Sequence, residues 1–294
     1  NQKYNNRMKL ICRIFSAVVL SLAVLASCSD ASQMYVPEGY ELVWSDEFDG
    51  DVLNRDYWTP EIGHGQGGWG NAELQYYTDR EENLMVRDGK LVITARKESY
   101  EGADVTSARI KTLDKVTFLY GYVVASIKLP KTADGLWPAF WMMGNEITEL
   151  GWPNCGETDV LEMGHADGIK AGTQEQFLNG ACHWGVPHHQ FHANHITHDY
   201  SVQDDEFHTY TCIWDEEYIR MYIDFEKRPS AAPYFEMKIE DFGNGEFRKD
   251  NFILFNLAVG GNFPAIWDIN QVTALDAGPA EMQIDYVRVF QKKN

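Results

Sequence analysis

The sequence predicts an all-β protein whose strands form two antiparallel sheets packed as a sandwich. Aromatic residues make up 13% of the chain, Gly is frequent, and few stretches follow a helical repeat. Short apolar runs alternate with turn residues, as is typical of sandwiches. The 294 residues contain no internal repeat and no long linker, so we expect one large domain. Two curved sheets would leave one concave face open as a cleft for a substrate.

The expected strands follow one another along most of the chain. The run 40–48 alternates apolar and polar residues, and 84–97 predicts two strands around the turn Asp88–Gly89. A second hairpin is expected within 207–224. The remaining strands are expected at 107–112, 118–129, 139–144, 158–163, 252–259 and 281–290. Long loops rich in Gly, Trp and His, where binding groups often lie, are expected at 63–73, 144–154 and 183–199.

The first 27 residues predict a secretory signal. Basic residues precede an apolar run, 14–26, that is too short to span a bilayer. LASC at 25–28 resembles a bacterial lipobox, which implies cleavage before Cys28 and lipid on its sulfur; an ordinary signal peptide is the alternative. We therefore expect a signal at 1–27, a tether at 28–38 and a catalytic domain at 39–294. The protein would be secreted across the inner membrane and lipid-anchored in the cell envelope, at the outer membrane or cell surface.

The charge of the chain excludes some partners. Loss of the signal would remove four cations and no anions, and would lower the formal net charge from −19 to −23. Such a surface repels nucleic acid and anionic lipid, and argues weakly against sulfated glycans. Three cysteines would remain, without zinc-like spacing, and we expect them to be buried apolar groups. A bridge within one pair, Cys155 and Cys182, stays open.

Three acids lie close together in GETDVLEM (156–163), and their spacing fits neither a regular strand nor a helix. On a strand, Glu157 and Asp159 share one face, and Glu162 would point away. A β-bulge after Asp159 adds one residue and returns Glu162 to the face of Glu157. Carboxyls in such a row share protons, so one pKa would rise while another stays low. That split supplies the nucleophile and the acid that retaining glycosidases use. A solvated acidic edge strand is the alternative, but the flanking residues are apolar.

Further motifs make the resemblance specific. E-x-D-x-x-E after WPNCG resembles glycoside hydrolase family 16 in its laminarinase-like branch. The resemblance extends through WGNAELQYYT (69–78), TSARI (106–110), YGYVVASIKLP (120–130), GLWPAFWMMG (135–144), HWG (183–185), NLAVGGNFP (256–264) and IDYVRVF (284–290). It implies a jelly-roll, concanavalin A-like fold and an endo-acting, retaining hydrolase of β-1,3 or mixed β-1,3/1,4-glucans. Glu157 would be the nucleophile, Asp159 its assistant and Glu162 the acid/base. Thr158 departs from the usual aliphatic residue and should face away from the cleft.

The same resemblance implies the groups around the acids. Trp69, Asn71, Arg109, Trp137, Trp141 and His183 would bind the glucan, with Trp152, Trp184 and Trp267 as rims of the cleft. No cofactor is implied for catalysis. A structural Ca²⁺ is implied, with the carboxylate of Asp285 and carbonyls near Glu47 and Gly89 as ligands. The six histidines of 183–198 lack zinc spacing and predict a solvated loop at the cleft edge.

Alternative functions follow from the same features. The chain could hydrolyse another polysaccharide, such as an agar- or porphyran-type galactan. It could also be a surface glycan-binding lipoprotein without catalysis, but a binding protein would not need all three acids. A structural envelope protein leaves the acids and the Trp-rich loops unexplained. We expect a monomer whose partners are a β-glucan and, through Cys28, the membrane.

Overall fold

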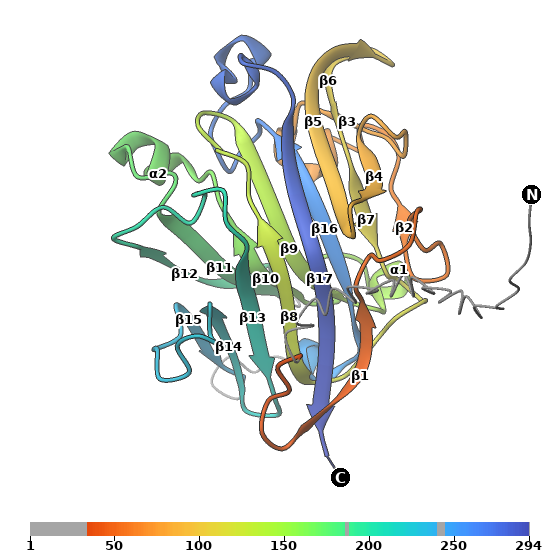
Figure 1. Ribbon diagram of the computed structural model, residues 1–294, viewed down its shortest axis with the longest axis vertical. Coiled ribbons are helices and arrows are strands. Elements are labelled where there is room, and N and C mark those ends of the chain that lie inside the picture. Colours follow the sequence, from red (N-terminus) through yellow and green to blue (C-terminus); the bar gives the residue numbers. More distant parts are fainter. Residues whose placement is uncertain (1–33, 186–187, 240–244, 294) are drawn as a thin grey trace, which may run out of the picture. The chain divides into compact units, whose positions relative to one another are not determined.

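The computed structural model describes residues 34–185, 188–239 and 245–293. The chain from Val36 onward forms one compact unit. The expected signal, the lipobox and most of the tether lie outside the described residues. Within the described part of the chain, none of the helices has the length and apolar character that a membrane span requires. The unit consists mainly of two sheets that lie face to face (Figure 1).

The larger sheet has ten strands and is organised around the long C-terminal strand β17 (Ala280–Lys292). One edge of β17 pairs first with β5 (Lys90–Tyr100) and then with β1 (Tyr40–Asp46), and the other edge pairs with β8 (Gly121–Lys128). The other members are β13 (His208–Trp214), β14 (Tyr218–Ile223), β15 (Phe235–Lys238), β4 (Leu84–Arg87), β6 (Ala103–Ser107) and β3 (Tyr76–Tyr77). Only the short β3–β6 pair among these is parallel.

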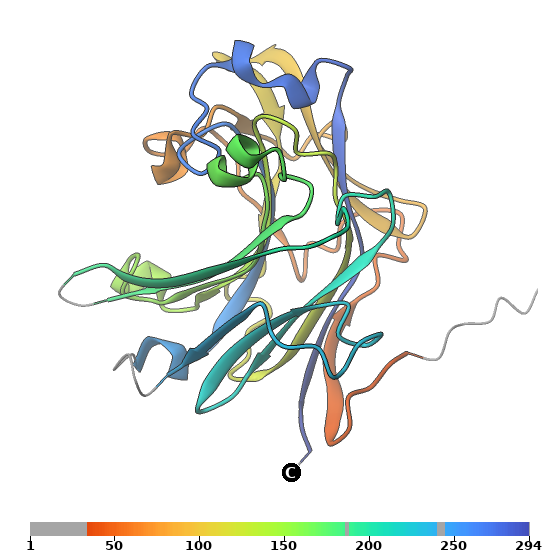
Figure 2. The same ribbon diagram turned by 90° about the vertical axis from the view of Figure 1, so that its left-hand side faces the viewer.

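The smaller sheet has seven strands, and each neighbouring pair is antiparallel. Its order is β12 (Gln190–Thr197), β11 (Phe177–Trp184), β10 (Glu157–Glu162), β9 (Leu136–Gly144), β16 (Asn251–Val259), β7 (Arg109–Lys111) and β2 (Thr59–Pro60). One face packs on the larger sheet. We call the other the carboxylate face, because it carries the three acids. Figure 2 shows the two sheets as separate layers, with β10–β12 over β13–β15.

Helical segments are short and lie in the connections between strands. They are α1 (Ile147–Leu150), α2 (Ala166–Ala171) and the turns Gly68–Ala72, Gly245–Arg248, Ile269–Gln271 and Thr273–Leu275. Helix α2 begins after His165, whose Nδ1 accepts a hydrogen bond from the Asp167 amide at 3.0 Å. It ends at Gly172, which has a φ of +68°.

The apolar core fills the space between the two sheets. Phe140 on β9 and Phe255 on β16 are fully buried and stack with ring centroids 5.0 Å apart. The cysteines Cys155, Cys182 and Cys212 are buried and unbridged, as apolar groups should be. The open alternative of a Cys155–Cys182 bridge is therefore wrong. Burial of so many aromatic and aliphatic side chains holds the two sheets in a fixed relation, which in turn fixes β10 within its sheet.

One strand prediction and one loop prediction are wrong. The run 107–112 is not one strand, because β6 ends at Ser107 in the larger sheet and β7 begins at Arg109 in the smaller one. The stretch 183–199 is not a loop, because β11 continues to Trp184 and residues 190–197 form the edge strand β12. Both faces of β12 carry polar residues, so its period of two was hidden. Both predicted hairpins are confirmed as β4–β5 and β13–β14.

Candidate active site

The three acids of GETDVLEM lie on one face of a bulged strand, as the spacing predicts. Glu157 is opposite His183 of β11, Asp159 is opposite Ala181, and Glu162 is opposite Asn179. Two residues of β10 therefore face one residue of β11 between Asp159 and Glu162, and β9 shows the matching irregularity. The extra residue keeps Glu162 on the carboxylate face.

The residues between the acids are directed into the sandwich. Val160 and Leu161 are fully buried in the main core, which explains why a strand with three carboxylates also carries large apolar side chains. Thr158 is buried, and its Oγ1 lies 3.8 Å from Sγ of Cys182, itself a core residue. The prediction that Thr158 faces away from the acids is confirmed. The bulge thus lets one strand satisfy the core and the carboxylate face together.

Burial raises the pKa of all three carboxyl groups. The pKa of Glu157 rises to about 7, and the positive charge of Arg109 opposes the rise. The pKa of Glu162 rises to about 8, because burial is reinforced by the negative charge of Glu157. Asp159 lies between the two, and its burial together with the negative charges of Glu157 and Glu162 raises its pKa well above its usual value. The expectation that one pKa stays low is wrong, since desolvation affects all three, but the two glutamates still differ in the expected sense.

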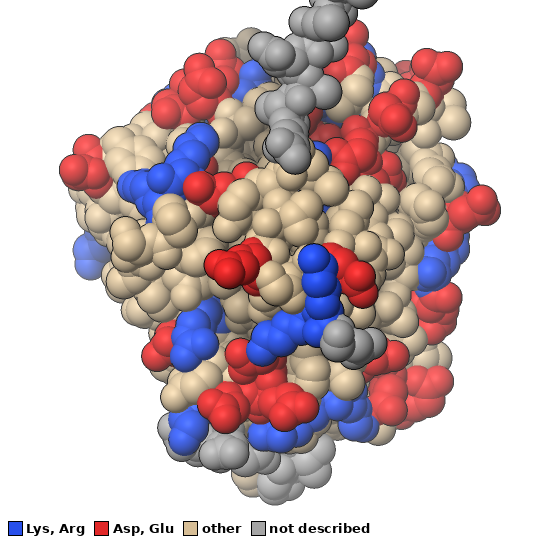
Figure 3. Space-filling model, turned by 60° about the horizontal axis from the view of Figure 1, so that its bottom comes forward, with Lys and Arg blue, Asp and Glu red and all other residues tan. Residues whose placement is uncertain are grey.

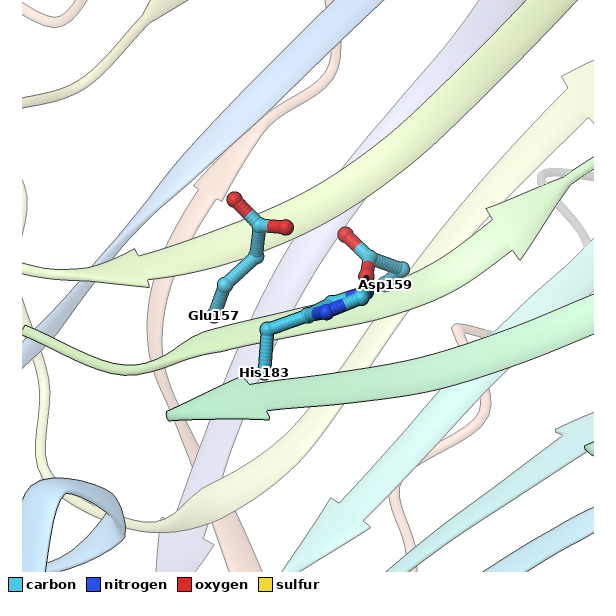
Figure 4. Close-up of side chains that lie close together, drawn as sticks. All are labelled: Glu157, Asp159 and His183. Carbon is cyan, nitrogen blue, oxygen red and sulfur yellow. Dashed lines mark ion pairs between the residues drawn. The ribbon is translucent and has the colours of Figure 1, made fainter. Parts of the chain in front are cut away.

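A histidine closes one side of this row (Figure 4). His183 comes from the neighbouring strand β11, and its Nε2 lies 3.4 Å from Oδ2 of Asp159. Its Nδ1 lies 2.9 Å from Nε2 of His189. Burial, together with the nearby His189, lowers the pKa of His183 to about 4, so the imidazole is neutral at neutral pH. The neutral ring of His183 therefore adds no positive charge to the site.

The same three residues are the one group in the described part of the chain that resembles a metal site. Potential ligand atoms of Glu157, Asp159 and His183 all lie within 4.8 Å of one another. The resemblance assigns two of them, Glu157 and Asp159, to catalysis and the third, His183, to binding of the glucan. Their proximity is therefore explained by the row of acids and the histidine opposite it, without a metal.

Two tryptophans of β9 contact the site in different ways. Trp137 is half-buried, donates a hydrogen bond from Nε1 to Oε1 of Glu162 at 3.0 Å, and stacks on Phe263 with centroids 4.7 Å apart. Trp141 lies opposite Asp159 but is only 8% exposed. Its Nε1 donates to Oδ1 of Asn256 at 2.7 Å. Trp137 can therefore offer a ring edge beside the acid, whereas Trp141 forms the floor.

Arg109 lies between two indole rings on the other side of Glu157. Its guanidinium carbon is 4.6 Å from the ring centroid of Trp69 and 4.8 Å from that of Trp141. Its Nε also donates to Glu61, which accepts a second bond from Lys111 at 2.7 Å. The two cations lower the pKa of Glu61 against the effect of burial. This pairing holds Arg109 in place and leaves its charge within reach of Glu157.

The loop that carries Trp69 and Asn71 is shaped by glycine. Gly68 has a φ of +61°, and a Cβ there would lie 2.5 Å from the backbone nitrogen of Glu73. The turn therefore folds back on Glu73, a residue that is only 4% exposed. Asn71 Nδ2 lies 3.5 Å from the carboxylate of Glu73, and the Tyr77 hydroxyl donates to it at 3.1 Å. Burial raises the pKa of Glu73.

Several residues of the site were not singled out by sequence reasoning. Asn256 donates from Nδ2 to the Tyr77 hydroxyl at 3.2 Å and so links the Glu73 group to Trp141. Both Glu73 and Asn256 lie within motifs that carried the resemblance, which was the available signal. His189 and Phe191 have no such signal, because the stretch around them lacks the apolar–polar alternation that predicts a strand.

The rim residues fall into two groups. Trp152 and Trp267 are 49% and 57% exposed, consistent with positions at an edge. Trp184 is 3% exposed and packs against Phe247 in the core. Its assignment as a rim is therefore wrong. HWG places His183 and Trp184 on opposite faces of β11, as alternation requires.

The residues expected to bind calcium lie on the larger sheet. The strand register brings the β4–β5 turn with Gly89 and the end of β1 with Glu47 beside the stretch of β17 that holds Asp285. Both carboxylate oxygens of Glu47 accept from Arg288, at 2.9 and 2.7 Å. Its main-chain carbonyl is thus the group left for a ligand. An oxygen-only set from these three residues fits the preference of Ca²⁺.

Comparisons with known proteins agree with this geometry. The family model described as Glycosyl hydrolases family 16 matches residues 71–233. The β-glucanase of Rhodothermus marinus is 32% identical over 94% of this chain and 94% of its own length. Glucan endo-1,3-β-glucosidase A1 of Niallia circulans is 34% identical over 87% of this chain, which spans 38% of that longer relative.

A solved structure extends the likeness to three dimensions. The Bacteroides ovatus mixed-linkage glucan GH16 protein, in complex with a G4G4G3G product, superposes with a TM-score of 0.74. It is 37% identical, and the match covers 84% of this chain and 100% of that one. The two-sheet fold of this chain is therefore also found in a solved structure of a family 16 protein.

Proposed function

The chain belongs to glycosyl hydrolase family 16, and from that premise we propose that it is an endo-acting, retaining hydrolase of β-1,3 or mixed-linkage β-1,3/1,4-glucans. The observation that carries the proposal is the row of Glu157, Asp159 and Glu162 on one bulged strand. The names of the similar proteins, a β-glucanase and an endo-1,3-β-glucosidase, support the substrate class. The glycan product bound in the Bacteroides ovatus structure supports a carbohydrate as the substrate class.

In the first step, Glu157 attacks the anomeric carbon while Glu162 protonates the departing glycosidic oxygen. The C–O bond to the leaving sugar breaks, and an ester between Glu157 and the remaining glycan forms. The order of the two pKa values suits these roles, because Glu157 loses its proton before Glu162 does.

In the second step, Glu162 acts as a base. It removes a proton from water, the oxygen attacks the anomeric carbon, and Glu157 departs as a carboxylate. Two inversions retain the configuration. Asp159 offers a carboxyl oxygen within 4.8 Å of one of Glu157, so its role in this proposal is to assist Glu157 when the ester breaks and the carboxylate returns.

The binding groups differ between the two arms of the carboxylate face. Asn71, Arg109 and Trp69 lie toward β7 and β16, where amide and guanidinium groups can bind hydroxyls and the indole can stack on a sugar. Trp137 and His183 lie beside the acids themselves, and Trp141 lies beneath them. No organic cofactor enters this chemistry.

We also propose that the protein is a monomer anchored by lipid on Cys28 after export across the inner membrane. The basic start, the short apolar run and LASC in the sequence support the anchor. Mass analysis of the mature N-terminal peptide should find an acylated Cys28, and an unmodified cysteine or a different cleavage site would contradict the anchor. A calcium ion at Asp285, Glu47 and Gly89 completes the proposal.

The function is tested by product analysis with three polymers. The protein is incubated with β-1,3-glucan, mixed-linkage β-1,3/1,4-glucan and β-1,4-glucan. We expect short oligosaccharides from at least one polymer that contains 1,3-linkages, with the β configuration at the new reducing end in early NMR spectra. Glu157→Gln should lower the rate by at least about 10³-fold. Glu149→Gln, an exposed acid of α1, serves as the matched control.

Each other outcome has a clear meaning. Release of the α anomer from the start would contradict the retaining mechanism. Ordinary turnover by Glu157→Gln would contradict the assignment of the nucleophile. If no glucan is cleaved but the polymers retard the protein in a gel, the glycan-binding alternative replaces the enzyme. If no glucan is cleaved or bound, the galactans are the next substrates to assay.

A further inference from the structure

We propose that the protein has a second glycan-binding site outside the carboxylate face, in a pocket on the reverse side of the loop that carries Trp69. We call it the rear pocket. Its occupant is a stretch of β-glucan other than the one that lies across the three acids. The ligand class rests on the proposed function, whereas the pocket is separate from the catalytic row. The rear pocket holds a polymer against the protein while another part of it is cleaved.

The rear pocket is a hollow of about 770 Å³ between three segments of the chain. One side consists of residues from the loop 67–74, a second of residues 101–105 at the turn between β5 and β6, and a third of residues 267–269. The β5–β6 hairpin extends at the top of Figure 1. Small-molecule sites commonly have volumes of about 300–1,000 Å³, so the hollow is large enough for a short stretch of glycan.

Strand alternation separates the rear pocket from the carboxylate face. Tyr76 and Tyr77 are neighbours on β3, so their side chains point to opposite sides. The Tyr77 hydroxyl donates to Glu73 at 3.1 Å, and its ring lies 5.5 Å from that of Trp69. Tyr76 instead lines the rear pocket and packs edge-on against Tyr100 of β5. The rear pocket therefore lies on the other side of β3 from Trp69.

Glycines keep two walls of the rear pocket open. Gly67 and Gly102 have φ values of +61° and +84°, a region that suits glycine. A Cβ atom at either position would meet no other part of the protein within 4 Å. The walls therefore have free space in front of the backbone at these points, and a ligand can approach the main chain closely.

Trp267 supplies a fixed aromatic wall. The residue is 57% exposed, and its Nε1 donates to Oδ1 of Asn262 at 3.1 Å. The amide of Asn262 donates in turn to the carbonyl of Asn71 at 2.8 Å, which ties this segment to the loop 67–74. The indole is thus held in one orientation while much of its surface faces solvent. A ring held in this way can stack on the apolar C–H face of a sugar without first being ordered.

The charge of the rear pocket selects a neutral ligand. Glu101, Asp104 and Asp268 line it, and no Lys or Arg of the described residues is among the lining groups. Carboxylates accept hydrogen bonds from hydroxyls and repel sulfate and phosphate groups. These three do not form a cation site, since the one close group of possible metal ligands in the described part of the chain lies on the carboxylate face. A neutral polyol with an apolar ring face fits both the acids and the indole.

The occupant is a separate stretch of polymer rather than a side branch of the chain in the cleft. The loop 67–74 contributes Trp69 and Asn71 to one side and Gly67, Gly68 and Leu74 to the other. A single branching sugar on a chain beside Trp69 would have to pass through this loop to reach the rear pocket. A second stretch of glucan reaches it directly from solvent.

Two sites on one polymer change how the protein uses long and short substrates. A chain held in the rear pocket keeps the rest of the same polymer at a high effective concentration near the acids. The affinity for a polymer then exceeds that for an oligosaccharide that occupies the cleft alone. The rear pocket should therefore lower KM for polymers and leave the chemistry of cleavage unchanged.

The test compares the polymer that the protein cleaves with a tetrasaccharide of the same linkage, which is too short to occupy both sites. Ala103→Trp fills the rear pocket, because Ala103 lines it at the start of β6. We expect this variant to raise KM for the polymer about five-fold and to leave kcat/KM for the tetrasaccharide unchanged. Trp267→Ala removes the aromatic wall and should raise KM for the polymer by a similar factor. Val52→Ala removes an apolar side chain that is 77% exposed outside the rear pocket, and serves as the control.

A second measurement needs no catalysis. The Glu157→Gln protein, with and without Ala103→Trp, is run through a native gel that contains the β-glucan. The cleft is the same in both proteins, so weaker retardation of the double variant reports loss of binding at the rear pocket. We expect the dissociation constant from the retardation to rise about five-fold.

Two outcomes would overturn the second site. Wild-type KM for the polymer in both variants, with unchanged retardation in the gel, would show that the rear pocket binds no glucan. An equal loss on the polymer and on the tetrasaccharide would place the lost contacts in the cleft. If the wild-type protein cleaves no glucan, the proposed function fails instead, and the gel still tests the rear pocket, so the two failures are distinct.

Discussion

The carboxyl groups of Glu157 and Glu162 experience the same burial but different neighbours. Arg109 supports the charged form of Glu157, whereas the charge of Glu157 itself disfavours ionisation of Glu162. Arg109 on β7 and a hydrogen bond from the Trp152 side chain both lower the pKa of Glu157, and Arg109 does not act on Glu162 in this way. Because the two titrations are coupled, they belong to the pair rather than to separate groups.

This arrangement predicts a narrow, bell-shaped pH dependence of kcat/KM. Glu157 must be ionised, so the rate rises as the pH passes through about 7, and Glu162 must be protonated, so the rate falls above about 8. Arg109→Met removes the cation, raises the pKa of Glu157 and should move the acidic limb to higher pH. Initial rates on a soluble glucan between pH 5 and about 10 measure both limbs.

Lys111→Met is the control for that experiment. Lys111 pairs with the same Glu61 as Arg109 but does not contribute to the pKa of Glu157. Its acidic limb should stay where the wild type has it. If both variants move the limb equally, the effect belongs to the general loss of positive charge and the role given to Arg109 is wrong.

At the scale of the element, the one-residue bulge of β10 places side chains of the same strand both on the carboxylate face and in the core. The bulge allows three carboxylates on one face and keeps Val160 and Leu161 in the core. If one residue between Asp159 and Glu162 were removed, the two acids would be two residues apart. The pairing of β10 with both β9 and β11 would then be regular. The bulge is therefore a means of adding core volume without turning Glu162 away.

Deletion of Val160 tests this account. The remaining sequence, ETDLE, alternates regularly, so Glu162 should stay opposite Asn179 and activity should fall by no more than about ten-fold. The loss of a buried valine should lower the free energy of unfolding by about 2 kcal/mol, measured in urea. Activity as low as that of Glu157→Gln in a folded protein would show that the bulge itself sets the catalytic geometry.

The same strand shows what a sequence can predict. A spacing of two and then three gave the bulge, because side-chain alternation leaves no other way to gather the acids. The pattern failed at β12, where Phe191, Ala193 and His195 alternate with residues that are also polar or exposed. It failed at Ser107–Arg109 because nothing local marks the crossing of the chain between sheets. Partners such as Asn256 and Glu73 depend on folding of distant segments, so spacing could not reveal them.

At the scale of the whole molecule, the larger sheet supports the site from behind. Its central strand β17 holds β5 and β1 together at the stretch where Asp285, Glu47 and Gly89 gather. A cation there would tie the first strand, a hairpin turn and the last strand to one another.

Figure 3 shows acidic and basic side chains interspersed on the face at the lower end of the unit.

Removal of the proposed calcium ion should therefore lower the thermal stability of the protein more than it lowers the catalytic rate. We expect EDTA to reduce the Tm by about 4–8 °C and added Ca²⁺ to restore it, since binding to the folded state alone stabilises it by about 2–3 kcal/mol at 100 times the Kd. Asp285→Asn should melt below the wild type in Ca²⁺, and the two proteins should melt at similar temperatures in EDTA. Equal melting curves for the wild type with and without Ca²⁺ would show that the proposed calcium site is wrong.

The pairing of β1 with β17 has a consequence for the architecture of longer proteins. Tyr40 lies opposite Lys292, and the Lys293 amide donates to the carbonyl of Gly39 at 2.9 Å. The polypeptide therefore enters and leaves this unit at neighbouring points. A module with adjacent ends can be spliced between other modules without distorting them, and a short loop joining the two ends would permit circular permutation. The unit is therefore suited to insertion into other proteins as an independent module.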